Sequence, residues 1–176
     1  MSRFDQPTPG SLADRQVEAD PESVARTIAL RRLDFAPRTR ANLAATFAER
    51  GIPDDVATKV LDRFEEVGLI DDAAYAQLLL SSRSGSRGLS GPALRAEFKR
   101  RGVPDSITDQ VLSEIEPEAV FSDACAIVRS KWKSSARLDD ASRTRRLTAA
   151  LQRRGYSFGV ISRAIRAVSE EIASPD

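Results

Sequence analysis

The sequence predicts an all-α protein: three tandem three-helix repeats that form an elongated, curved helical array. The phrase Leu-x3-(Phe/Leu)-x2-Arg-Gly occurs three times and ends at Gly51, Gly102 and Gly155, which gives a period of about fifty residues. Apolar residues recur at intervals of three and four along the whole chain, without the alternation typical of strands. A unit this small barely offsets its chain entropy alone, so we expect neighbouring repeats to pack on one another.

Five segments follow from this pattern. Residues 1–20 combine prolines, a glycine and charges without periodicity, which predicts a disordered leader. The repeats are expected over residues 21–70, 71–116 and 117–172, and they leave a short tail at 173–176.

Start and stop signals define the helices of the first repeat. Asp20, followed by a proline and a glutamate, is typical of a helix N-terminus and predicts a helix to about residue 34. Pro37 opens a second helix, which Gly51 ends in a left-handed conformation. Pro53 opens a third helix, and Gly68 closes it.

The second repeat begins just after Gly68. Asp71 or Asp72 is expected to cap its first helix, while Leu69 and Ile70 fill the seam between the repeats. The two aspartates could instead form a catalytic or metal-binding pair. Adjacent residues at a helix start rarely point at the same atom, and no third acid or histidine accompanies them, so the capping role is favoured.

The remaining helices repeat this plan. A glycine-rich loop over residues 84–91 precedes a helix that starts at Pro92 and stops at Gly102, and the next helix runs from Pro104 to about residue 115. In the third repeat, helices are expected from Pro117, over 139–154, and from a Ser157 cap to about residue 172.

Composition excludes several classes of function. The chain has one cysteine and no histidine, which excludes an internal disulfide and a Cys/His metal site and removes the commonest general base. We also expect no cofactor and no catalytic residue. No apolar run approaches the length of a membrane span, and no signal sequence begins the chain, so a cytoplasmic protein without a membrane partner is predicted.

The net charge of +1 hides an asymmetry. Residues 1–77 carry a net charge of −4, and residues 78–166 carry +8. A basic block of this kind indicates an anionic partner, with nucleic acid first, although a solvated arginine-rich helical surface would look the same. The candidate binding residues are Arg83, Arg87, Arg95, Lys99, Arg100, Arg101, Lys131, Lys133, Arg143, Arg146, Arg153, Arg154, Arg163 and Arg166.

Trp132, the only tryptophan, lies between two of these lysines. Cations around an aromatic ring can clamp a phosphate backbone and stack a base. The alternative, which we favour, makes Trp132 a residue of the core or of a seam between repeats.

Several stretches, in their order and spacing, resemble the RecX regulatory proteins in their actinobacterial-type form. The resemblance covers about residues 23–168, and its motifs include Gly51-Ile52-Pro53, Gly68-Leu69-Ile70-Asp71-Asp72, Arg87-Gly88-Leu89 and Arg153-Arg154-Gly155-Tyr156-Ser157. It implies a cytoplasmic modulator that lodges in the groove of the RecA–DNA filament. Such a protein restrains strand exchange, ATP hydrolysis and co-protease activity without catalysing a reaction.

Two hypotheses follow. The first is a monomeric regulator that binds the RecA filament, and its single- or double-stranded DNA, through the basic surfaces of the second and third repeats. The second is a helical DNA-binding module that acts without RecA. A helical adaptor for a partner peptide would need an apolar groove, which the sequence does not indicate.

Overall fold

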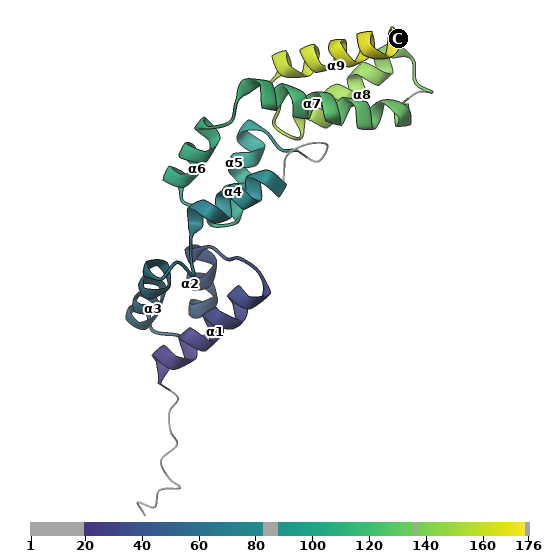
Figure 1. Ribbon diagram of the computed structural model, residues 1–176. Helices are drawn as coiled ribbons and strands as arrows, with labels where there is room; N and C mark the ends of the chain where they lie inside the picture. Colours follow the sequence, from purple (N-terminus) through teal and green to yellow (C-terminus); the bar gives the residue numbers. More distant parts are fainter. Residues whose placement is uncertain (1–19, 83–87, 136, 175–176) are drawn as a thin grey trace, which may run out of the picture. The chain divides into compact units, whose positions relative to one another are not determined.

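The computed structural model describes residues 20–82, 88–135 and 137–174 (Figure 1). Within these ranges the regular structure consists of nine α-helices and one 3-10 turn, so the all-α class and the three three-helix repeats are confirmed. The predicted leader up to residue 19, Arg83, Arg87 and the last two residues of the tail lie outside the described residues. None of the helices described is both long enough and apolar enough to cross a membrane.

The chain divides into two compact units. The first unit contains α1 (Pro21–Phe35), α3 (Asp54–Glu66) and all of α2 (Arg40–Glu49) except its first turn. The cap predicted for α1 is confirmed, because the Asp20 carboxylate accepts hydrogen bonds from the backbone N–H groups of Glu22 and Ser23.

The start of α2 differs from the prediction. The helix begins at Arg40 and not at Pro37, because Thr39 is the residue that caps it. The Thr39 hydroxyl accepts a hydrogen bond from the backbone N–H of Asn42 at 3.2 Å, as an N-cap side chain does.

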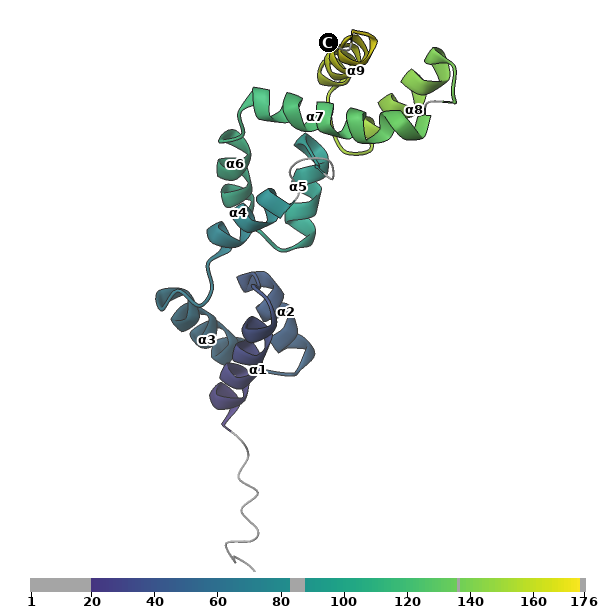
Figure 2. The same ribbon diagram turned by 45° about the vertical axis from the view of Figure 1, so that its right-hand side comes forward.

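The second unit holds the second and third repeats together with residues 39–42. Its elements are α4 (Asp72–Ser82), α5 (Gly91–Arg100), α6 (Asp105–Ser113), α7 (Pro117–Trp132), a 3-10 turn (Lys133–Ser135), α8 (Asp140–Gln152) and α9 (Phe158–Ala173). In the third repeat, α9 packs along α7, and α8 contacts both (Figures 1 and 2).

The predicted helix-ending glycines are confirmed. Gly51, Gly68, Gly102 and Gly155 have φ values of 70°, 71°, 76° and 86°, which is the left-handed region that side chains disfavour.

Each repeat has its own apolar core. Phe47 and Phe64 lie in the core of the first repeat, Phe98 lies in that of the second, and Leu151 lies in that of the third. The prediction that Leu69 and Ile70 fill a seam needs correction. Ile70 belongs to the core of the first repeat, whereas Leu69 is 45% exposed, because only one of two adjacent side chains in this short turn can face inward.

Within the second unit, a backbone hydrogen bond joins the second repeat to the third. The backbone N–H of Ser90, just before α5, donates to the carbonyl of Arg154 at 2.8 Å. A Cβ added to the next residue, Gly155, would lie 2.0 Å from the Ser90 carbonyl oxygen, so only glycine fits here.

The same unit contains a second contact of this kind. Thr39, which precedes α2 as Ser90 precedes α5, donates its hydroxyl to the carbonyl of Arg101 at 2.8 Å. A Cβ added to Gly102 would lie 2.8 Å from that of Ala41. The Arg-Gly turn of one repeat thus packs against the start of the second helix of the repeat before it.

The third repeat differs at the corresponding position. Thr39 and Ser90 lie four residues before the leucine of the repeated phrase, and in the third repeat that position is Arg143. Here α8 has already begun at Asp140, one turn earlier, and the backbone N–H of Arg143 donates to the carbonyl of Asp139 at 2.9 Å.

Candidate nucleic-acid interface

Three of the four predicted cations that the structure describes in the second repeat are paired with acids. Arg95 forms an ion pair of 2.6 Å with Asp109, and both Arg100 and Arg101 pair with Glu97. Hydrogen bonding to Glu97 raises the pKa of Arg101 above its ordinary value, because it favours the charged guanidinium. Lys99 alone in this group has no ion pair among the described residues.

Two cations of the α7–α9 face are also neutralised. Arg163 lies over the Phe121 ring, 3.8 Å from its centre, and pairs with Glu118 at 3.3 Å. Arg129 forms an ion pair of 2.7 Å with Glu171, whose pKa is lowered by the hydrogen bond from Arg129. These pairs are exposed, and each adds little stability.

Arg143 is a structural residue in this arrangement. Its side chain is only 16% exposed, and it donates to the carbonyls of Ser135 and Leu138 and pairs with Asp140. The guanidinium also lies over the ring of Trp132, 5.0 Å from its centre. Trp132 itself is partly buried against the core of the third repeat. Because it packs on the core and Arg143 lies over its ring, the interpretation as a core residue is favoured.

Three other cations meet around one small pocket. Lys131 in the last turn of α7, Arg146 on α8, and Arg153 at the C-cap of α8 line a polar pocket of about 140 Å³. We call this the α7–α8 basic pocket; its other lining residues are Ser134, Ser135, Leu147 and Ala150.

The walls of the α7–α8 basic pocket are held in place by short-range hydrogen bonds. The hydroxyl of Ser134 donates to the carbonyl of Lys131 at 2.9 Å, and that of Ser135 donates to the carbonyl of Trp132 at 2.9 Å. The serine protons are therefore used in fixing the turn. The free donors of the pocket are the N–H groups of the three cations.

The electrostatics of the α7–α8 basic pocket favour an anion. Lys131, Arg146 and Arg153 have no carboxylate partner among the residues described, and no acid lines the pocket. A volume of about 140 Å³ is below that of a typical small-molecule site but admits a phosphate group. Guanidinium groups bind phosphate oxygens in a bidentate manner, and the ammonium adds a point charge.

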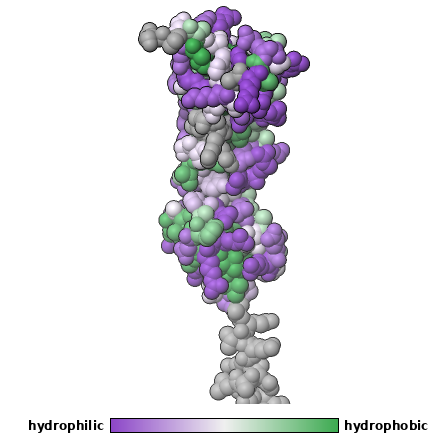
Figure 3. Space-filling view, turned by 90° about the vertical axis from the view of Figure 1, so that its right-hand side faces the viewer, coloured by the Kyte–Doolittle hydropathy of each residue, from purple (hydrophilic) through white to green (hydrophobic). Residues whose placement is uncertain are grey.

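The other predicted cations of the third repeat lie outside this pocket. Lys133 and Arg166 are exposed, and Arg154 donates to the carbonyl of Ala150 at 3.0 Å. Hydrophilic side chains dominate the visible face of the third repeat, at the top of Figure 3.

Sequence reasoning named Lys131, Arg146 and Arg153 separately and did not identify them as one site. The spacing of seven residues between the two arginines, which places Arg146 and the C-cap residue Arg153 on one side of α8, was the available signal. The two serines of the pocket were missed.

The acids and the thiol have structural roles. Asp71 caps α4, because its carboxylate accepts from the backbone N–H of Ala74 at 2.8 Å, and this confirms the capping interpretation. Asp72 accepts from the backbone N–H of Arg40 at 2.9 Å, also within the second unit.

Cys125 is buried, which raises the pKa of its thiol. Over the stretches of chain described, no group of acids and thiols could hold a metal ion.

Three family profiles match the chain in order. RecX, first three-helix domain, matches residues 25–64; the second three-helix domain matches 71–112; and the third matches 118–165. Similar curated proteins include Regulatory protein RecX of Streptomyces coelicolor, which is 42% identical over 152 residues, covering 86% of this chain and 81% of that protein. Regulatory protein RecX of Mycobacterium avium is 46% identical over 141 residues, covering 80% of this chain and 82% of that protein.

Solved structures share the fold. The crystal structure of RecX from Lactobacillus salivarius superposes with a TM-score of 0.73 at 16% identity, covering 86% of this chain and 99% of that one. A second crystal structure, of regulatory protein RecX, gives a TM-score of 0.71 at 22% identity, covering 84% and 74%.

Proposed function

This chain belongs to the RecX family, and from that premise we propose that it is a non-enzymatic regulator that binds the RecA–DNA filament. In this role it lowers the recombinase, ATPase and co-protease activities of RecA and so regulates DNA repair and recombination. It acts in the cytoplasm, where the RecA filament forms, and it binds as a monomer.

One observation carries the part of this proposal that concerns DNA. The three cations of the α7–α8 basic pocket converge without a carboxylate among them, whereas Arg95, Arg129 and Arg163 are each paired with an acid. Unpaired cations around a phosphate-sized space support binding to the phosphate backbone of DNA, because no ion pair has to be broken first.

The test is RecA-dependent ATP hydrolysis on single-stranded DNA, titrated with this protein. We expect inhibition well below one protein per RecA. The variant Lys131→Gln/Arg146→Gln/Arg153→Gln should need a markedly higher concentration for the same inhibition.

The matched control is Arg95→Gln/Arg129→Gln/Arg163→Gln. It removes the same number of positive charges but takes them from ion pairs, so it should inhibit nearly as well as the wild type. Equal loss in both variants would show that net charge alone, and not the pocket, determines binding. No inhibition by the wild-type protein would contradict the proposed regulation of RecA.

A second candidate is a DNA-binding module that acts without RecA. The same pocket supports it, because its recognition of phosphate does not depend on RecA. Tight, salt-sensitive binding to bare DNA together with unchanged RecA ATPase would favour this candidate.

A further inference from the structure

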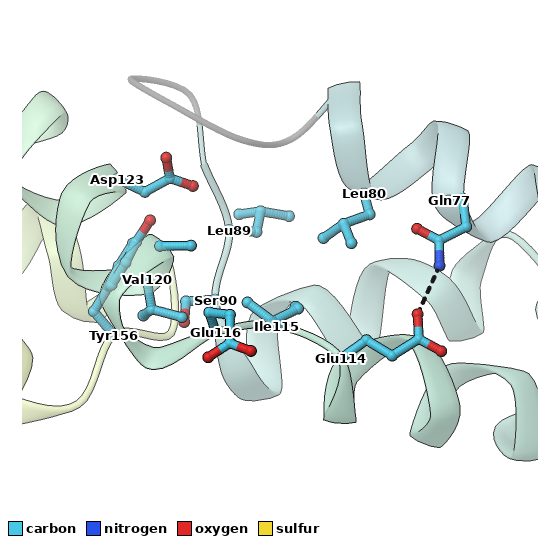
Figure 4. A pocket seen from close by; sticks show the side chains of 11 residues that line it. Gln77, Leu80, Leu89, Ser90, Glu114, Ile115, Glu116, Val120, Asp123 and Tyr156 are labelled. Carbon is cyan, nitrogen blue, oxygen red and sulfur yellow. Dashed lines mark hydrogen bonds between the residues drawn. The ribbon is translucent and has the colours of Figure 1, made fainter.

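A second and larger pocket lies within the second unit, where the second repeat meets the third. It has a volume of about 360 Å³, within the range of small-ligand sites, and shares no lining residue with the α7–α8 basic pocket. Its apolar wall comes from Leu80, Leu89, Ile115, Ala119 and Val120 (Figure 4). Three acids, Glu114, Glu116 and Asp123, also line it.

Tyr156 gives this pocket an unsatisfied polar atom. The residue is only 5% exposed, and its hydroxyl has no hydrogen-bond partner among the described residues. In Figure 4 the ring enters the pocket from the third repeat, with the hydroxyl on the side of Asp123. A buried hydroxyl without a partner is unfavourable, so it indicates a missing ligand atom.

Packing does not explain this hydroxyl. The positions that correspond to Tyr156 in the first and second repeats are Ile52 and Val103, both buried and both aliphatic. A hydrocarbon side chain is therefore sufficient to fill the position after the Arg-Gly turn. The phenol adds a polar group only in the third repeat.

Two of the acids, Glu114 and Glu116, give the pocket negative charge. The Glu114 carboxylate accepts hydrogen bonds from Gln77 at 3.1 Å and from Gln110 at 3.3 Å, and both donors are neutral amides. Glu116 stands at the N-cap of α7 without capping the helix, so its carboxylate remains available. Burial, with the Asp123 charge as the next contribution, raises the pKa of Tyr156 to about 12, so the phenol keeps its proton at neutral pH.

We propose that this pocket binds an organic cation, namely an alkylammonium or alkylguanidinium group. The alkyl stem lies against Leu80, Leu89 and Ile115, and the N–H groups donate to the Tyr156 hydroxyl oxygen and to the carboxylates of Glu114 and Glu116. An anion would be repelled by those carboxylates, and a purely apolar ligand would leave the hydroxyl without a partner. The same chemistry is carried by a lysine or arginine side chain of a polypeptide and by a free amine.

The experiment is an amide NMR titration of the full chain with agmatine and with n-butylammonium. We expect saturable shifts at Leu80, Leu89 and Tyr156. The neutral 1-butanol and the anion butyrate, which have similar stems, should give no saturable shift there. The absence of saturation with both cations, or equal binding of 1-butanol, would overturn the proposal.

Two variants with a matched control locate the cation. Tyr156→Phe removes only the hydroxyl, and Glu116→Gln removes only a charge; each should weaken binding by about three- to tenfold, as expected for one hydrogen bond or charge contact. Glu118→Gln, two residues further along and outside the pocket lining, should leave the affinity unchanged. Unchanged affinity in both pocket variants would contradict the assignment even if the cations bind elsewhere.

A further binding measurement distinguishes a polypeptide side chain from a free amine as the ligand. Binding of acetyl-Gly-Arg-Gly-amide more tightly than agmatine would support a polypeptide side chain as the ligand. Tighter binding of agmatine would support a free amine. None of these measurements depends on RecA, so the failure of this proposal and that of the proposed function are distinguishable.

Discussion

The backbone N–H of Ser90 donates to the carbonyl of Arg154 at 2.8 Å, and this bond joins two consecutive repeats through residues that are 64 positions apart in the sequence. The residue after Arg154 must be a glycine for two reasons. Its φ of 86° is left-handed, and the Ser90 carbonyl lies where a Cβ would be.

Gly155→Ala should therefore destabilise the second unit by about 3 kcal/mol or more, from left-handed strain plus a backbone clash. Urea unfolding followed by circular dichroism measures the change. Gly51→Ala, with φ of 70° but nothing within 4 Å of the added Cβ, should cost only about 1–2 kcal/mol. Equal costs would show that the contact with Ser90 is unimportant.

Salt dependence tests the α7–α8 basic pocket. On single-stranded DNA, each phosphate contact contributes about 0.7 to the log–log salt slope. Lys131→Gln/Arg146→Gln/Arg153→Gln should therefore bind with a slope shallower by about 2, measured by fluorescence anisotropy.

The comparison protein for this measurement is again Arg95→Gln/Arg129→Gln/Arg163→Gln. Its slope should change by less than about 1, since those cations are occupied by acids. The interpretation of the pocket fails if the two triple variants have the same slope.

Arg143→Lys should destabilise the third repeat by about 1–3 kcal/mol. A lysine cannot bond both Ser135 and Leu138 while it lies over Trp132. Urea unfolding followed by fluorescence of Trp132, the only tryptophan, gives the free energy of unfolding. Arg145→Lys, at an exposed position on the same helix, should change it by less than about 0.5 kcal/mol. A similar loss in both would argue against a special role for Arg143.

Alkaline pH should destabilise the protein through Tyr156. The pKa of Tyr156 is raised from 10.0 to about 12 in the folded state. The stability that depends on the protonated phenol is therefore complete below pH 10 and is lost as the pH rises from 10 to about 12. Tyr156→Phe should lose less stability over that interval. At pH 7 the same variant should be more stable by about 1 kcal/mol, since it removes an unpaired buried hydroxyl. Identical pH profiles would contradict the assigned pKa.

Local signals predicted much of the fold. The Asp20 cap, the left-handed Gly51 and Gly155, and the Ser157 cap all depend on residues within a few positions of each other, and all are confirmed. The start of α2 was misplaced because a proline and a threonine compete as start signals. The threonine hydroxyl also bonds Arg101, far along the sequence.

The candidate site was predictable only in part. Arg95 and Arg163 look like free cations in the sequence, because Asp109 and Glu118 reach them only once separate helices pack together. Likewise, the position of Lys131 next to Arg146 and Arg153 depends on where α7 ends relative to α8. Tyr156 could be singled out in the sequence, because it is a phenol at the position where the first two repeats have the aliphatic residues Ile52 and Val103.

The extra turn at the start of α8 limits how such a chain can grow by duplication. If a repeat were inserted between the second and third, the N–H of Ser90, which now donates to Arg154, could donate to the Arg-Gly turn of the inserted repeat instead. A repeat appended after α9 would meet Arg143, whose N–H already bonds Asp139. We therefore expect longer versions of this architecture to arise by internal insertion, with the third repeat retained as the last.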